Sequence, residues 1–375
     1  MTRTGQLRIG WPVGAMVFSV GVLWLVFRMA FAPPVAVTDL DRDLIGARAA
    51  IEGYSPYQRL GEIEMLIPEI EVDEAWEPFW VSHAPFSIAL ARGMWMAFGD
   101  FAESVARIGV VLSLGLLMII PPLRMGLPLP LGLFLGGSLA LSAGAALDIG
   151  FLQGAALLGV GILVVFDLSI RHPALALAVM ALCVAWRPWC APLALFLPLA
   201  NRPLRNAAWV AIGATGVTLA SLPALGGLQA LYDWLWVAAP ANLGENLRVQ
   251  FNGSLLAPAA GAVVSGALLV ASVAALATLR SRIRSQHLGG ASLAVLAFFP
   301  LVWPPHWVGL YPGLVFERSE EDAIVLGVAL LILANPLTTW GGPVVWRAAT
   351  AIPITLLGWW WVRSSVWRGP LSQPD

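Results

Sequence analysis

Half of the acidic residues of this chain fall in one short segment. Eleven of its 22 Asp and Glu residues lie between residues 39 and 77, although the chain is 59% hydrophobic and only 11% charged. The segment opens with the alternating aspartates Asp39, Asp41 and Asp43. In a chain that keeps ionisable groups out of its apolar segments, such a cluster indicates polar chemistry. One carboxylate in this place could serve as a general base.

Several other polar residues lie at the ends of apolar segments. Arg187, Arg248 and His306 could hold an anionic group such as a phosphate. Gln153 and Asn252 lie at similar ends and are candidates for substrate contact. Each residue alone could also have a purely structural role, as a snorkelling arginine or as part of a capped helix end. Taken together with the acidic segment, they predict one site.

Two structural interpretations compete with catalysis for the aspartates. Asp39 could be the N-cap of a helix, because aspartate is among the best capping residues. The alternating aspartates also resemble a calcium loop, which requires Gly at its sixth position and Glu at its twelfth. Those positions hold Leu44 and Ala50. We expect no cofactor and no metal; a divalent cation is compatible with the aspartates, but nothing in the sequence indicates one.

The elements that position these residues can be predicted from the pattern of apolar residues. Leu40, Leu44, Ala47 and Ile51 form one stripe of an amphipathic helix, which Gly53 should end. The spacing predicts a helix from residue 39 that lies along the outer membrane surface with its apolar stripe toward lipid.

Apolar segments of transmembrane length recur along the chain. They predict an all-α polytopic membrane protein with about twelve transmembrane helices and one integral membrane domain over residues 1–375. The outer loop of residues 33–83 should carry amphipathic helices, and residues 84–98 should form a re-entrant or interfacial helix. The predicted spans are 11–32, 104–121, 127–145, 151–168, 173–187, 189–200, 206–224, 254–279, 289–303, 307–317, 322–337 and 343–362.

The distribution of arginine predicts the orientation of the chain. All 21 basic residues are arginine, and most of them lie at alternate ends of the predicted spans. The positive-inside rule then places both termini in the cytoplasm and residues 33–83 outside. We expect a plasma (inner) membrane protein whose site faces the periplasm or exterior, with membrane lipids and no nucleic acid as partners. The first apolar segment exceeds the usual length of a signal peptide, which favours a retained helix over cleavage.

A series of short motifs in chain order resembles the GT-C class of membrane glycosyltransferases. The chain is most similar to glycosyltransferase family 87, the polyprenyl-phosphate-mannose type. Three positions depart from the family pattern: Asp43 stands where an aromatic residue is usual, Arg187 replaces a lysine, and Pro304-Pro305 interrupts the histidine motif. The matching positions are Asp39-Leu40, Ala47, Gly53, Pro56, Tyr57, Gln153, Arg187-Pro188, Asn252–Leu255, Trp303 and His306.

The resemblance implies an inverting, mannosyltransferase-like enzyme that moves a sugar from a polyprenyl-phosphate carrier to a lipid or glycan acceptor. Asp39 would be the catalytic base. A polytopic transporter or lipid-linked sugar flippase is the alternative, although transporters usually show internal repeats that are not visible here. A non-catalytic assembly protein is a third alternative. The donor phosphate would be bound by Arg187, His306 and Arg248, and the substrate would be contacted by Asp41, Asp43, Tyr57, Gln153 and Asn252.

Overall fold

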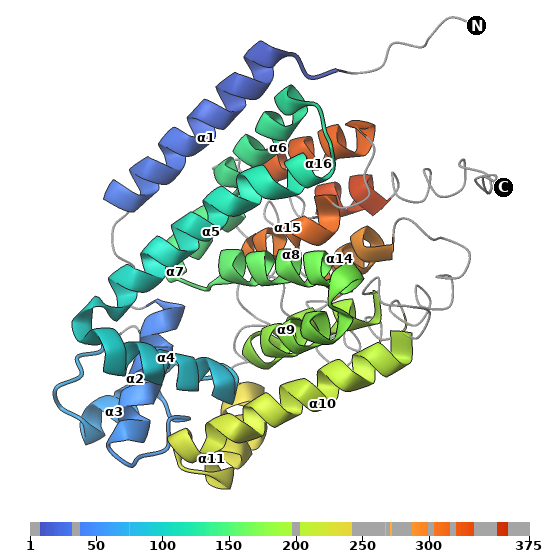
Figure 1. Cartoon of the computed structure of the whole chain (residues 1–375). Coiled ribbons are helices and arrows are strands. Elements are labelled where there is room, and N and C mark those ends of the chain that lie inside the picture. The colour runs from blue at the N-terminus through green and yellow to red at the C-terminus, as the bar shows by residue number, and fades with distance from the viewer. Residues whose placement is uncertain are drawn as a thin grey trace, which may run out of the picture. The chain divides into compact units, whose positions relative to one another are not determined.

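The computed structural model describes residues 8–31, 38–196 except 75, 203–241, 267, 271, 287–298, 304–315, 320–333 and 351–358. These residues are mainly helical (Figure 1), and no β-strand is assigned among them; one isolated bridge pairs Arg59 with Trp80. The all-α prediction is therefore confirmed for this part of the chain.

The residues group into two compact units. The first unit comprises Met1–Val26, Leu114–Ala146 and Gln250–Asp375. The second unit comprises Phe27–Ser113 and Leu147–Val249. The acidic segment and the 153–187 region both belong to the second unit.

The helices follow the predicted spans closely in position but not always in length. The α-helices are α1 (Trp11–Phe31), α2 (Asp39–Ile51), α3 (Leu60–Leu66), α4 (Pro85–Phe98), α5 (Ala102–Arg124), α6 (Leu129–Leu141), α7 (Ala143–Phe151), α8 (Ala155–Arg171), α9 (Pro173–Trp186), α10 (Pro203–Ser221), α11 (Leu228–Asp233), α14 (His287–Phe298), α15 (Pro304–Val315) and α16 (Glu320–Leu333). The shorter elements are the 3₁₀ helices η1 (Gly99–Phe101), η2 (Pro188–Phe196) and η3 (Leu222–Leu225) and the π-helix η4 (Trp234–Ala238).

In the described part of the chain, three helical stretches are long and apolar enough to cross a membrane, namely Trp11–Ala30, Pro85–Arg124 and Leu204–Leu225. A fourth exists if α6 and α7, which meet at a bend of 49°, count as one span. The predicted count of about twelve is not confirmed. Among the predicted spans, 254–279 lies almost entirely outside the described residues, and of 343–362 only residues 351–358 are described, as a helix.

Two predicted spans differ from the structure for local reasons. The segment 127–145 is broken at Ser142, whose hydroxyl donates to the Leu139 carbonyl at 2.7 Å and accepts the Ala145 N–H at 3.2 Å, so that α7 begins anew. The segment 189–200 was expected to be an α-helix, but residues 188–196 form a 3₁₀ helix of nine residues with Pro192 inside it. At about 2 Å per residue, that helix is shorter than a membrane crossing.

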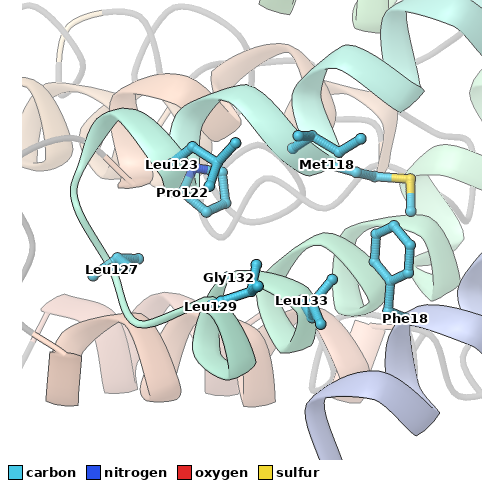
Figure 2. Close-up of a pocket in the computed structure, with 9 residues that line it drawn as sticks. Phe18, Met118, Pro122, Leu123, Leu127, Leu129, Gly132 and Leu133 are labelled. Atoms are coloured by element: carbon cyan, nitrogen blue, oxygen red, sulfur yellow. The ribbon is translucent and has the colours of Figure 1, made fainter. Parts of the chain in front are cut away.

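Close helix packing in the first unit is typical of membrane proteins. A side chain at Gly137 of α6 would meet the backbone oxygen of Val17 of α1 at 2.4 Å, and one at Gly21 would meet the Gly137 oxygen at 2.8 Å. Glycine thus lets α1 and α6 approach at backbone distance, as small residues do in membranes. The same unit contains a cavity of about 50 Å³ between α1, α5 and α6 (Figure 2). Its lining is apolar and contains no predicted site residue.

The second unit has its own apolar core beneath the acidic segment. Leu44 and Ala47 of α2 are buried with Leu60 and Ile63 of α3, and α2 also packs against α4. The expected helix is therefore present at the expected residues, and it ends before Gly53, whose φ is +85°. Leu44 and Ala47 of its apolar stripe face protein, which corrects the expectation that the whole stripe faces lipid, whereas Ile51 is exposed. The place of α2 at the membrane surface stays a prediction.

Candidate functional site

The start of α2 is capped by Thr38 and not by Asp39. The Asp41 N–H donates to the Thr38 hydroxyl at 3.0 Å, and the Thr38 N–H donates to the Asp41 carboxylate at 2.7 Å. These two hydrogen bonds form a capping box. The N-cap interpretation of Asp39 is therefore wrong, because Asp39 is the first residue of the helix and its carboxylate takes no part in the cap. Asp41, one of the predicted substrate ligands, is engaged in the cap.

This arrangement gives a prediction about stability. Replacing Thr38, which is 1% exposed, with alanine should remove the hydroxyl acceptor of the capping box and lower the free energy of unfolding by about 1 kcal/mol. Denaturant titration of the purified protein in detergent would measure the difference from wild type. An unchanged stability would contradict the capping role that the two hydrogen bonds indicate.

Asp39 is a buried carboxylate surrounded by cationic groups. It is 6% exposed and forms an ion pair with Arg42, which lies one helical turn further on. Burial alone would raise the pKa of Asp39, but the charges of Arg42, His83 and Arg187 outweigh burial and lower the pKa below its ordinary value. Asp39 is thus held ionised and can accept a proton or hydrogen bond.

Asp43 lies on the same side of α2, one turn beyond Asp39, and is 3% exposed. One carboxylate oxygen contacts His83 Nδ1 at 2.7 Å, and the other accepts a hydrogen bond from the Ser87 hydroxyl at 2.6 Å. Ser87 lies in the first turn of α4. Asp43 therefore joins α2 to the loop and helix that follow the acidic segment.

Arg187 is the C-cap residue of α9. Its guanidinium donates to the Gln153 carbonyl at 2.6 Å and lies 5.2 Å from the centre of the Trp186 ring. It also interacts electrostatically with both Asp39 and Asp148. The structure thus brings together Arg187 and Gln153, which were predicted separately, although Gln153 contributes its backbone carbonyl to this contact.

The turn between α7 and α8 has an unusual backbone. Leu152 has φ +50° and Gly154 has φ +71°, and a side chain at Gly154 would meet the Trp186 ring at 2.7 Å. Asp148 stabilises the turn by accepting the N–H groups of Ala155 and Ala156 at 2.9 and 2.8 Å. Positive φ at a non-glycine residue is uncommon in proteins. The residues that adopt it are frequently found at functional sites. The predicted span from residue 151 accordingly begins only at residue 155.

The remaining predicted residues have different surroundings. Tyr57 is 2% exposed, and its hydroxyl has no hydrogen-bond partner among the described residues. His306 is buried in α15 and belongs to the first unit. Arg248 and Asn252 lie outside the described residues. The roles assigned to these four residues stay predictions.

Sequence reasoning missed Arg42, His83 and Ser87. The spacing of three between Asp39 and Arg42 could have revealed their pairing, because residues three apart are neighbours on a helix. The contacts of Asp43 with residues 83 and 87 bridge 40 or more positions and depend on how α2 packs on α4. No local pattern reports such contacts. The His83 loop is anchored from η4, where the Trp234 indole N–H donates to the Ser82 carbonyl at 3.1 Å.

Within the described ranges, no group of three or more His, Cys, Asp and Glu side chains is arranged to hold a metal ion. Compared with models of protein families and with curated proteins, the sequence matches none of them. The chemistry of the site must therefore be argued from its residues.

Proposed function

We propose that this protein is an integral membrane glycosyltransferase that moves a sugar from a polyprenyl-phosphate carrier to a lipid or glycan acceptor. Asp39 acts as the base, and the anomeric centre is inverted. The observation that supports this proposal is the buried, ionised Asp39 carboxylate with Arg187 nearby. A base and a cation at one place are the two groups that the reaction needs.

The chemistry assigns a separate task to each group. Asp39 accepts the proton of the acceptor hydroxyl while the acceptor oxygen attacks the anomeric carbon. The bond from that carbon to the carrier phosphate breaks, and the electron pair leaves with the phosphate. Arg187 stabilises the charge that builds on the phosphate. A phosphate leaves without protonation, so the second carboxylate that a glycosidase requires is not needed.

A transporter or lipid-linked sugar flippase remains the second candidate. Transport sites are typically formed near the membrane midplane by interrupted helices. The bend between α6 and α7 is such an interruption. The charged groups described above instead gather at the first turn of α2 and the end of α9, which favours transfer chemistry.

Purified protein incubated with a panel of polyprenyl-phosphate sugars and lipid acceptors would test the proposal. Release of free carrier phosphate together with a glycosylated acceptor is the expected result. Movement of the intact lipid-linked sugar between leaflets of vesicles, without release of phosphate, would support the flippase instead.

The proposed location of the site gives a prediction about topology. Glu69 is exposed in the turn after α3, whereas Glu64 accepts the Val72 N–H. Glu69→Cys should react with an impermeant thiol reagent added to intact cells, because residues 33–83 are expected outside. The native Cys183 and Cys190 are both buried and should stay unlabelled.

Arg171→Cys is the matched control, since Arg171 is exposed at the end of α8 and is expected in the cytoplasm. It should react only after the membrane is permeabilised. The reverse pattern would place the acidic segment inside and overturn the proposed topology.

A further inference from the structure

One face of the helical segment after α10 is exposed and apolar. α11 continues directly into the π-helix η4, so that residues 228–238 form one segment. Its exposed apolar side chains have the spacing typical of one helix face. They are Leu228 (73% exposed), Tyr232 (57%), Leu235 (45%) and Trp236 (71%). We refer to these four side chains as the exposed stripe.

The opposite face of this segment packs against the acidic segment. Ala230 is buried in the core that also contains residues of α2 and α3. The Asp233 carboxylate accepts a hydrogen bond from the Ser55 hydroxyl at 2.7 Å, and the Trp234 indole N–H donates to the Ser82 carbonyl at 3.1 Å. The hydrogen-bonding groups of Asp233 and Trp234 thus face protein, whereas the exposed stripe faces away from it.

The segment begins where a helical stretch of membrane length ends. Leu204–Leu225 is long and apolar enough to cross a membrane, and its side chains Trp209 and Leu219 are exposed as well. Gly226 and Gly227, with φ of +97° and +78°, turn the chain between that stretch and α11, which lies at the end of α10 (Figure 1). The exposed stripe therefore continues a surface that lipid would cover.

We propose that α11 and η4 form an interfacial helix whose exposed stripe lies in the headgroup region of the lipid bilayer. Tyrosine and tryptophan are enriched at this depth, because their rings are apolar and their polar atoms still reach water. The segment is too short to cross the bilayer. A stripe of four side chains is also far smaller than the roughly 20 residues that each partner contributes to a stable protein interface. The inference holds for a transferase and a flippase alike, since it concerns the membrane contact and not the reaction.

Trp236→Cys tests this placement, because a cysteine at this exposed position leaves the core intact and the native Cys183 and Cys190 are buried. The variant is labelled with a thiol-reactive fluorophore and reconstituted into phosphatidylcholine vesicles. Lipids with a nitroxide near the headgroup end of the acyl chain should quench the label more strongly than lipids with a nitroxide at the chain terminus. Iodide on both sides of the membrane should quench it little. Tyr232→Cys, one turn earlier on the stripe, should behave in the same way.

Glu69→Cys is the control, since Glu69 is exposed in the turn after α3 and lies outside the stripe. Iodide should quench its label strongly, and neither lipid should. Equally strong iodide quenching in both stripe variants would overturn the proposal, because the stripe would then face water. Stronger quenching by the chain-terminal nitroxide would place the segment in hydrocarbon and overturn it as well. A disulfide between two copies of Trp236→Cys would show that a second copy, and not lipid, covers the stripe.

Discussion

Asp39→Asn is expected to lower the rate of sugar transfer by a factor of about 10² to 10⁴, the usual contribution of a general base. The amide of asparagine cannot take up a proton. Its oxygen can still accept the hydrogen bond that the Arg42 guanidinium donates to Asp39, so the protein should fold and bind donor. Release of carrier phosphate by the purified variant, measured beside its thermal midpoint in the same detergent, would separate loss of chemistry from loss of folding.

Asp41→Asn is the matched control for this variant. The same helical turn carries both aspartates, but the Asp41 carboxylate accepts the Thr38 N–H of the capping box, which an amide oxygen can also do. Turnover close to wild type is expected. If Asp39→Asn were equally active, Asp39 would be only the counter-ion of Arg42, and the search for the base would move to Asp43 and Asp148.

The second large effect is expected at Arg187. Arg187→Ala removes the cation that is proposed to stabilise the departing phosphate, and loss of such a group typically costs a factor of about 10² to 10³ in rate. Arg187→Lys should retain part of the activity, because a point charge remains. It cannot reproduce the planar contacts with the Gln153 carbonyl and the Trp186 ring. Initial rates over a range of donor concentrations would measure both kcat and KM.

Arg171→Ala serves as the control for charge removal at a helix end, because Arg171 ends α8 as Arg187 ends α9 and is exposed. It should leave both constants unchanged. Unaltered kinetics in Arg187→Ala would mean that the residue only anchors the end of α9 to the turn before α8.

The sequence predicted those features that arise from short-range periodicity. The helix of residues 39–51 appears at its expected place because its stripe has the helical period and Gly53 follows it. For Arg187 and Gln153, the sequence predicted only that both residues lie on the same side of the membrane. Their direct contact depends on Gly154, where any side chain would strike Trp186.

Features that depend on tertiary packing could not be predicted in this way. Capping by Thr38 was missed because both Thr38 and Asp39 are good caps and only the backbone geometry decides between them. The contact of Asp43 with His83 requires α2 to pack on α4. The helix break at Ser142 could not be predicted, because the residues on both sides of it are uniformly apolar. Hydropathy indicates which residues avoid water but not where a helix bends.

The ion pair between Asp39 and Arg42 has a consequence for the conditions under which the proposed enzyme could work. A carboxylate whose pKa is lowered keeps its charge as the pH falls and loses it only in more acidic solution than an ordinary aspartate. If the site faces outward as proposed, the acidity around it follows the surroundings. Arg42 would thus give the protein acid tolerance: sugar transfer could continue in an acid medium that would neutralise an unpaired aspartate.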